Sequence, residues 1–248
     1  MIDENENLKL NVEVIGKGKP VLILHGLAGH LNTMKVVFEP IFARTNDYQR
    51  IYVDLPGMGD SNAPIAFASS DKILEALLHF IKEKIGRPLL LIGYSYGGYL
   101  ARAITVKMPE LVDGLMLLAP MVIPTHEERM LPSNDWFKKS EKISTKKYLK
   151  AGWKEADPTF LAALDEQYAV SFEIDEQARK AQFDKVVLVV LGHQDTVVGY
   201  SDQLRLLTDY PRATFSVLDL AGHNLQMEQV ELLAALVENW LKRSKNEI

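Results

Sequence analysis

The sequence predicts an α/β fold built on a mostly parallel, doubly wound sheet. Short apolar runs rich in β-branched residues alternate with longer segments of helical period, and this alternation is typical of a parallel sheet between two layers of helices. Most of the runs are apolar throughout, which indicates strands covered on both faces. One segment, 121–184, contains no convincing strand and predicts a helical insertion between two core strands.

The apolar runs give seven predicted strands in chain order. They are Leu8–Ile15, Pro20–His25, Arg50–Leu55, Leu89–Tyr94, Gly114–Ala119, Val186–Leu191 and Thr214–Leu218. The first of them alternates between apolar and polar residues, which favours an edge strand. The predicted helices between them are Asp71–Ile85, Gly97–Met108, Asp202–Leu207 and Gln226–Leu241, and the first of these has Ser69, Ser70 or Asp71 as its cap. We therefore expect a core formed by residues 1–120 and 185–248, with 121–184 inserted between the two parts.

The insertion is rich in aromatic residues and in lysine. Two helix-like stretches and two loop signals, Pro132-Ser133-Asn134 and Asp157-Pro158, divide it. We expect Trp136 and Trp153 to contact an apolar substrate, although aromatic side chains can equally form a small core of the insertion itself. Its lysines favour either an anionic substrate or an ordinary solvated helix face.

Composition narrows the classes of function. The 248 residues carry a formal net charge of −5, which argues against a nucleic-acid partner, and the chain has no cysteine, which excludes disulfides and thiolate chemistry. The start, Met1–Leu10, lacks the basic and apolar regions of a secretion signal, and the longest apolar runs are too short to cross a bilayer. We expect a cytoplasmic protein that acts on a small molecule without a membrane partner. Its oligomeric state is left open.

A glycine-rich turn supplies the first candidate for chemistry. The strand Leu89–Tyr94 runs directly into Gly93-Tyr94-Ser95-Tyr96-Gly97-Gly98, so a serine lies at a strand-to-helix turn. Such a turn holds the hydroxyl out of the sheet, and small residues two positions away leave room for it. This pattern predicts Ser95 as a nucleophile.

A serine hydroxyl needs a base, and the base needs an orienting group. His223 follows the last predicted strand, and Asp195 follows Val186–Leu191, so both lie on loops at the same sheet edge as Ser95. The chain order of nucleophile, acid and base is the order found in one of the serine hydrolase folds. We expect Ser95, Asp195 and His223 to act together as a catalytic triad.

The loop after Pro20–His25 predicts the remaining parts of the site. The backbone N–H groups of Leu27 and Tyr96 are expected to stabilise an oxyanion. The expected substrate contacts, besides the two tryptophans, are His25, Gly26, Tyr94 and Met121. We expect no carboxylate cluster near the loop that carries His25 and His30, and therefore no metal site, and the triad requires no cofactor.

These motifs together resemble the α/β-hydrolase superfamily, in its branch of small bacterial hydrolases with a lid. The matching segments are His25-Gly26, Asp54–Ser61, Gly93–Gly98, Gly192–Asp195 and Ala221–His223. The resemblance implies an α/β-hydrolase fold with an eight-stranded core, a helical lid placed after the sixth strand, and a structural role for Asp54–Ser61. The amino-terminal part is shorter than the family pattern. Haloalkane dehalogenases and epoxide hydrolases resemble this fold but have aspartate at the position of Ser95, so those activities are not expected.

The expected function is that of a serine hydrolase, first of all a carboxylesterase with a small to medium apolar substrate. Ser95 would attack the carbonyl and form an acyl-enzyme that water then releases. The same triad serves carbon–carbon bond hydrolases, amidases or peptidases, and thioesterases, and a binding protein without catalysis is a further alternative on this fold.

Overall fold

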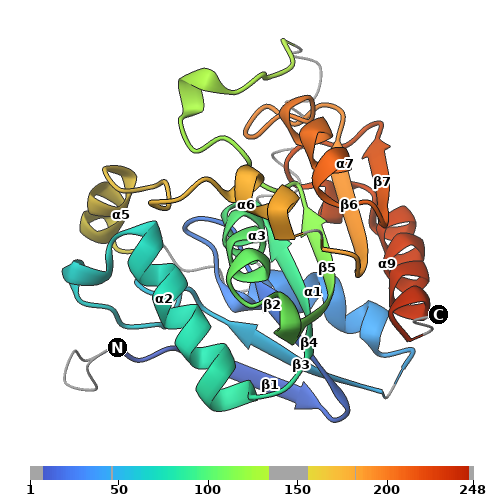
Figure 1. Cartoon of the computed structure of the whole chain (residues 1–248), viewed down its shortest axis with the longest axis horizontal. Coiled ribbons are helices and arrows are strands. Elements are labelled where there is room, and N and C mark those ends of the chain that lie inside the picture. The colour runs from blue at the N-terminus through green and yellow to red at the C-terminus, as the bar shows by residue number, and fades with distance from the viewer. Residues whose placement is uncertain (1–7, 46, 134–155, 182, 246–248) are drawn as a thin grey trace.

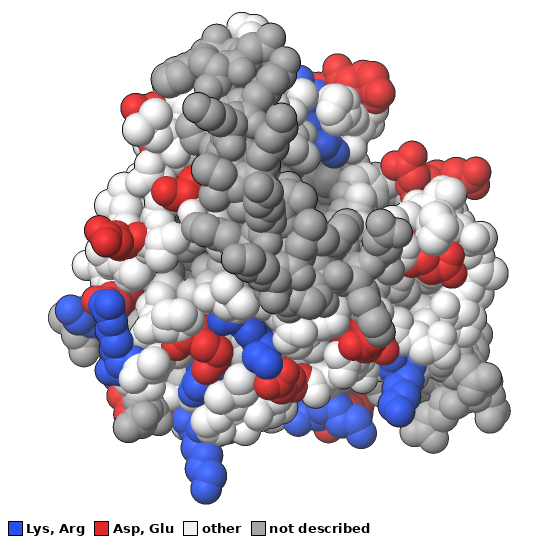
Figure 2. All heavy atoms as spheres, turned by 180° about the vertical axis from the view of Figure 1, so that it is seen from behind, with Lys and Arg blue, Asp and Glu red and all other residues white. Residues whose placement is uncertain are grey.

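The computed structural model describes residues 8–45, 47–133, 156–181 and 183–245, which form one sheet surrounded by helices (Figure 1). Among these residues, no helix combines the length and the apolar character that a bilayer span requires. Figure 2 shows that basic and acidic side chains lie next to each other along the lower edge of the molecule, so opposite charges are not gathered there in separate patches.

The described residues form a seven-stranded sheet in the order β1-β3-β2-β4-β5-β6-β7. The strands are β1 Val12–Gly16, β2 Lys19–Leu24, β3 Tyr48–Val53, β4 Leu89–Tyr94, β5 Val112–Leu118, β6 Val186–Gly192 and β7 Ala213–Leu218. Only β1 runs antiparallel to its neighbour, and it lies at an edge, as its alternating pattern predicts. The fold class is thereby confirmed, but the described chain gives seven strands where the resemblance implied eight. The eighth strand is not found among the described residues, because none of them precedes β1 in the sheet.

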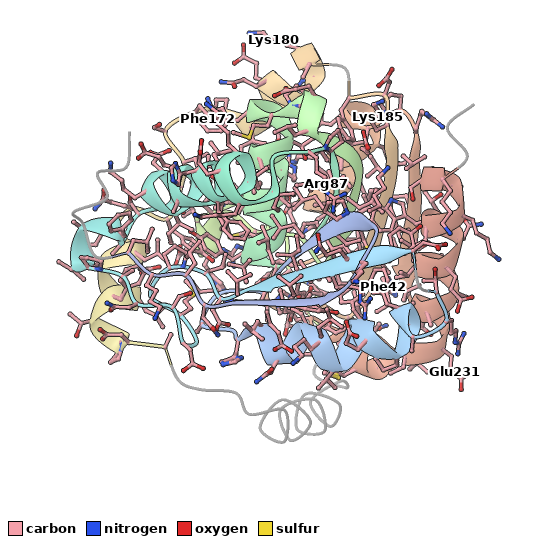
Figure 3. The ribbon with its side chains drawn as sticks, turned by 90° about the horizontal axis from the view of Figure 1, so that it is seen from below. Phe42, Arg87, Phe172, Lys180, Lys185 and Glu231 are labelled. Atoms are coloured by element: carbon pink, nitrogen blue, oxygen red, sulfur yellow. The ribbon has the colours of Figure 1, made fainter. Side chains whose placement is uncertain are left out.

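The helices cover the sheet in two layers. On one face, α1 Leu31–Phe42 packs on β2 and β3, and α9 Val230–Lys245 packs on β6 and touches α1. On the other face lie α2 Ser70–Phe80, its π-helical continuation η2 Ile81–Ile85, and α3 Tyr96–Lys107. Figure 3 shows this layering from below, with the sheet between the two sets of helices. Every residue of β4 and β6 is buried, because both faces of these central strands are covered.

The predicted helices are found, and one helix is additional. Ser69 caps α2 by accepting a hydrogen bond from the Lys72 amide. The predicted helix Gln226–Leu241 is interrupted at Gln229, and α9 begins at Val230 and ends four residues beyond the predicted end. The helix α1 was not predicted. Its cap is His30, whose Nδ1 accepts from the Asn32 amide, and it contains Pro40 in its last turn. Neither feature belongs to the usual signals of a helix start or interior.

Several short helices and turns connect the strands and the longer helices. The predicted helix at 202–207 is split into η6 Asp202–Arg205 and α7 Leu206–Asp209, and α8 Leu225–Glu228 precedes α9. Single 3₁₀ turns form η1 Ile65–Phe67, η3 Pro109–Leu111 and η4 His126–Glu128.

The described parts of the expected insertion contain no strand. They hold η4, α5 Pro158–Asp165 and α6 Ile174–Ala181, and α6 packs on α3. The aromatic residues Trp136 and Trp153 lie outside the described residues. The division into a core and a lid therefore remains a prediction.

Candidate active site

Ser95 is the single residue between β4 and α3, and its backbone is strained. It has φ 53° and ψ −116°, a left-handed region that residues with a side chain rarely adopt. The neighbouring glycines are required by close approach: a Cβ on Gly93 would lie 2.3 Å from the Gly97 carbonyl oxygen, and a Cβ on Gly97 would lie 2.4 Å from the His25 carbonyl oxygen. This turn therefore projects the Ser95 side chain beyond the carboxyl end of the sheet.

His223 lies between Ser95 and Asp195. Its Nε2 is 2.9 Å from Ser95 Oγ, and its Nδ1 is 2.9 Å from Asp195 Oδ2. Because an ionised carboxylate only accepts hydrogen bonds, Nδ1 carries the proton and Nε2 has a free lone pair for the serine hydroxyl. Such an arrangement can take the proton from the hydroxyl as the oxygen attacks a carbonyl.

Asp195 is fully buried, and its loop holds the carboxylate in place. Oδ1 accepts hydrogen bonds from the amides of Val197 at 2.8 Å and Val198 at 3.0 Å, which leaves Oδ2 for His223. The Asp195 loop follows β6 and the His223 loop follows β7, and the two pack so closely that a Cβ on Gly192 would lie 2.3 Å from the Gly222 carbonyl oxygen. The two loops are thus held together by close backbone contact.

Two residues that the sequence analysis did not single out support the His223 loop. The side chain of Gln194 accepts a hydrogen bond from the Ala221 amide at 3.0 Å and donates to Asp219 at 2.8 Å. The Tyr94 hydroxyl donates to Asn224 at 3.1 Å, and its ring lies 5.1 Å from that of His223. Their positions directly beside Asp195 and His223 in the chain are the signal that could have identified Gln194 and Asn224.

The loop after β2 lies against Ser95. A Cβ on Gly26 would be 3.1 Å from Ser95 Cβ, which places the following amide, that of Leu27, close to the serine turn. In the described part of the chain, neither the Leu27 amide nor the Tyr96 amide donates to a protein acceptor. Unpaired donors next to a nucleophile are suited to a developing oxyanion.

His25 does not reach the substrate side of this loop. Its ring is fully buried, with Nδ1 donating to the Gly26 carbonyl oxygen at 2.7 Å and Nε2 accepting from the Leu55 amide at 2.9 Å. Burial lowers the pKa of His25 to about 4, so the ring is neutral. The expectation that His25 contacts substrate is therefore corrected. Both of its ring nitrogens hold the loop, and His25 does not line the cavity beside Ser95.

Ser95 and His223 open into a cavity of about 900 Å³. Of the predicted contacts, Gly26, Tyr94 and Met121 line this cavity, as does Leu27. Residues not predicted from sequence complete its walls; they include Thr33, Arg129, Tyr168, Val197, Val198 and Asn224. The cavity is large enough for a medium-sized organic molecule.

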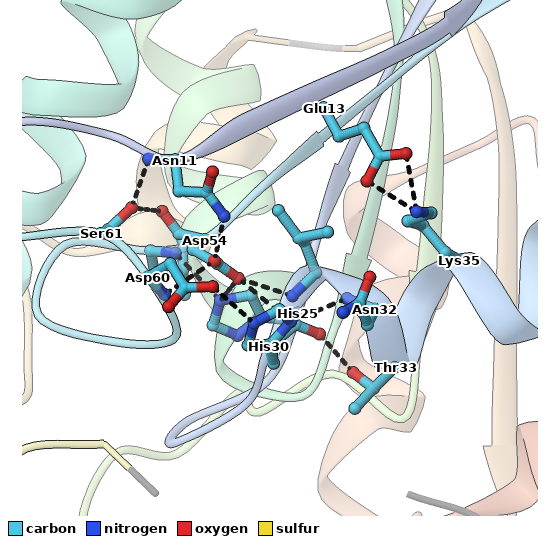
Figure 4. A network of polar contacts seen from close by, with 12 residues as sticks. Asn11, Glu13, His25, His30, Asn32, Thr33, Lys35, Asp54, Asp60 and Ser61 are labelled. Atoms are coloured by element: carbon cyan, nitrogen blue, oxygen red, sulfur yellow. Dashed lines mark hydrogen bonds and ion pairs between the residues drawn. The ribbon is translucent and has the colours of Figure 1, made fainter. Parts of the chain in front are cut away.

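A second polar cluster lies beneath the β2 loop (Figure 4). His30, Asp54 and Asp60 have ligand atoms within 4.8 Å of one another, so the sequence argument that no carboxylates lie near His30 is wrong. They were overlooked because the carboxylates follow β3, a neighbouring strand. The Asp54 carboxylate already accepts from the amides of Leu31 at 2.6 Å and Asp60 at 2.9 Å and from the Asn11 side chain at 2.7 Å, and His30 caps α1. These contacts fit a structural role at the start of α1.

Comparison with known proteins places the chain in a family. Residues 19–151 match the family described as alpha/beta hydrolase fold, and the chain belongs to this family. An alpha/beta superfamily hydrolase from Oenococcus oeni PSU-1 has 30% sequence identity and a TM-score of 0.84, over 96% of this chain and 97% of that one.

Two curated relatives differ in how much of the chain they match. A pimeloyl-[acyl-carrier protein] methyl ester esterase from Shewanella woodyi is 36% identical over 110 residues, only 44% of this chain and 39% of the esterase. A 2-hydroxy-6-oxo-6-(2'-aminophenyl)hexa-2,4-dienoic acid hydrolase from Metapseudomonas resinovorans is 26% identical over 258 aligned positions, which are 92% of this chain and 86% of that enzyme. The protein is therefore similar both to an esterase and to a dienoic acid hydrolase.

Proposed function

We propose that this protein is a serine hydrolase that cleaves carboxylic esters through an acyl-enzyme. The observation that carries the proposal is the continuous contact from Ser95 Oγ through His223 to Asp195, at 2.9 Å for each step, on the wall of a 900 Å³ cavity. Membership of the α/β-hydrolase family and the similarity to an esterase support it.

In the proposed mechanism Ser95 attacks the ester carbonyl while His223 Nε2 accepts its proton. Asp195 keeps His223 in the correct tautomer and stabilises the imidazolium. The amides of Leu27 and Tyr96 donate to the oxyanion of the tetrahedral intermediate, which then collapses as His223 protonates the departing alcohol. A water molecule, activated by His223, attacks the acyl-enzyme and releases the acid. No cofactor takes part in this scheme.

Hydrolysis of p-nitrophenyl esters from acetyl to lauroyl tests the proposal. The wild-type protein is expected to release p-nitrophenolate, with a chain-length optimum set by the cavity, and Ser95→Ala is expected to reduce the rate at least about a thousandfold. Equal rates for both proteins would overturn the proposal. Circular dichroism checks that Ser95→Ala remains folded.

Carbon–carbon bond hydrolysis is the second candidate, because the dienoic acid hydrolase matches this chain over most of its length. The two activities are distinguished by comparing substrates. A carbon–carbon hydrolase would cleave a 2-hydroxy-6-oxodienoate faster than any p-nitrophenyl ester in the series. A peptidase or thioesterase activity has no comparable observation in its favour here.

A further inference from the structure

Arg129 is a cation that lines the cavity, and no carboxylate of the described residues pairs with it. Its guanidinium donates to three backbone oxygens, those of Ile123 at 2.8 Å, Pro124 at 2.7 Å and Val197 at 3.0 Å. A fourth contact joins Nη2 to Met121 Sδ at 3.4 Å. Within the described chain no acid lies within ion-pair distance of Arg129, so these neutral acceptors fix its position without balancing its charge.

The fixed guanidinium retains capacity for a further ligand. A guanidinium has five N–H bonds, and the four contacts within the described chain use at most four of them. The remaining N–H bond belongs to Nη1, which makes one hydrogen bond, to the Val197 carbonyl oxygen. A half-buried cation with a spare donor and no counter-ion is a favourable partner for a carboxylate.

Tyr168 supplies a second donor to the same cavity. Its ring stacks on that of Tyr96, with centroids 4.9 Å apart, and this contact fixes the orientation of the side chain. Its backbone carbonyl oxygen is held by Ser70 at 2.6 Å, whereas its hydroxyl has no hydrogen-bond partner in the described chain. Both Tyr168 and Arg129 line the cavity that Ser95 opens into.

Arg129 lies close enough to Tyr168 for its charge to act on the Tyr168 hydroxyl. Burial raises the pKa of the Tyr168 hydroxyl; among the charges that act on it, Arg129 has the largest influence, and it lowers this pKa. Asp165 acts in the opposite direction and less strongly. The acids that line the cavity, Glu127, Asp165 and Glu166, are exposed and therefore screened by water.

We propose that Arg129 and Tyr168 form a subsite for a carboxylate of the substrate, so that the preferred esters carry a negative charge at a distance from the scissile bond. This inference rests on the proposed hydrolase function and specifies its substrate class. Arg129 binds the carboxylate with a charge-assisted hydrogen bond, and the Tyr168 hydroxyl donates a second one. Neither residue takes part in bond cleavage.

Two matched pairs of esters test the subsite. The mono-p-nitrophenyl ester of glutaric acid and its methyl-capped counterpart place the charge on the acyl side, and 4-acetoxybenzoate and its methyl ester place it on the leaving group. For at least one pair, we expect the wild-type protein to have a higher kcat/KM for the charged ester. In Arg129→Met the ratio of charged to neutral kcat/KM is expected to fall about tenfold to a hundredfold.

The ratio of charged to neutral kcat/KM distinguishes binding of the carboxylate by Arg129 from a structural effect of Arg129 on the cavity wall. Because Arg129 also holds Val197, its loss can slow both members of a pair, but only loss of a carboxylate contact changes their ratio. Arg129→Lys, which keeps the charge, is expected to retain part of the ratio, and Tyr168→Phe, which keeps the stacking, to lower it a few fold. Lys72→Met, on the exposed surface of α2, removes one unit of charge elsewhere and is expected to leave the ratio unchanged.

Competitive inhibition gives a readout that needs no variant. Glutarate is expected to inhibit the wild-type protein at a lower concentration than glutaramide. No preference for the charged ester in either pair, an unchanged ratio in Arg129→Met, or equal inhibition by glutarate and glutaramide would overturn the carboxylate subsite while ester hydrolysis persists. Absence of hydrolysis of every ester, p-nitrophenyl acetate included, would instead overturn the proposed function and the subsite with it.

Discussion

The Nε2 atom of His223 lies 2.9 Å from Ser95 Oγ, although 128 positions separate the two residues in the chain. The parallel sheet creates this contact, because the loops after β4 and β7 emerge at the same edge. Asp195 joins them from the loop after β6. The geometry therefore depends on three separate loops being held in register.

Asp195→Asn is expected to reduce kcat for p-nitrophenyl esters about a thousandfold or more with little change in KM. An asparagine amide would donate toward His223 and favour the tautomer in which Nε2 carries the proton, which cannot accept from Ser95. Steady-state kinetics measure the effect. Asp219→Asn is the control, because Asp219 is exposed, contacts Gln194 and His193, and as asparagine can still accept the hydrogen bond of Gln194. Similar losses in both variants would contradict the assigned role.

Gly97→Ala is expected to destabilise the protein by about 2–3 kcal/mol, because its Cβ would lie 2.4 Å from the His25 carbonyl oxygen and the loop would have to move. Gly86→Ala is the control. Gly86 has a φ of 61° but the nearest atom to its Cβ would be 3.5 Å away, so only backbone strain of about 1 kcal/mol is expected. Urea denaturation compares the two. A smaller cost for Gly97→Ala than for Gly86→Ala would show that the turn has room to relax.

The neutral, buried state of His25 predicts a pH dependence of stability. Since the pKa of His25 is lowered from 6.5 to about 4, the unfolded chain binds a proton there between these pH values while the folded chain does not. Stability is therefore expected to fall as the pH decreases from about 6.5 to about 4, by about 3 kcal/mol from this group. In His25→Asn this part of the pH dependence of the free energy of unfolding is expected to disappear. In His126→Gln, at an exposed site, it is expected to remain. An unchanged slope in His25→Asn would mean that another group titrates.

Asp175→Asn is expected to cost about 3 kcal/mol of stability. Arg102 on α3 is fully buried and pairs with Asp175 on α6 and, at 3.5 Å, with Asp209. Burial alone would raise the pKa of Asp175, but the charge of Arg102 and its hydrogen bond outweigh burial and lower it. Loss of the Asp175 carboxylate leaves the buried positive charge of Arg102 less well balanced.

The neighbouring pair Glu176–Lys180 provides the control for this experiment. Both of its side chains are more than half exposed, so Glu176→Gln is expected to change the free energy of unfolding by well under 1 kcal/mol. Thermal and urea unfolding distinguish the two variants. Equal effects would show that the contact between α6 and α3 does not depend on the buried Arg102.

Local patterns in the sequence were sufficient to predict the sheet and the members of the candidate triad. Continuous apolar runs mark the central strands, which are buried on both faces; Ser95 directly follows β4, and Asp195 and His223 lie a few residues beyond the ends of β6 and β7. Seven strands were located in this way. The helix α1 was missed because its cap, His30, and its internal Pro40 are unusual for a helix, and it is held instead by the contact of Asp54 with the Leu31 amide.

The parts of the site that depend on tertiary contacts could not be predicted. His25 follows a strand like other loop residues, and only the fold shows that its ring is turned inward onto Leu55. The proximity of His30 to Asp54 and Asp60 arises from the pairing of β2 with β3. Arg129 and Tyr168 both lie within the expected insertion but 39 positions apart, and no sequence pattern relates their positions.

Labelling with a fluorophosphonate probe, followed by intact-mass spectrometry and peptide mapping, shows whether Ser95 is an activated nucleophile. The reagent phosphonylates a serine only where a base activates its hydroxyl and an oxyanion site stabilises the transition state. We expect one adduct per chain, located on Ser95, with none in Ser95→Ala and much slower labelling in His223→Ala. An unlabelled wild-type chain, or an adduct on any other residue, would contradict the assignment of Ser95 as the activated nucleophile.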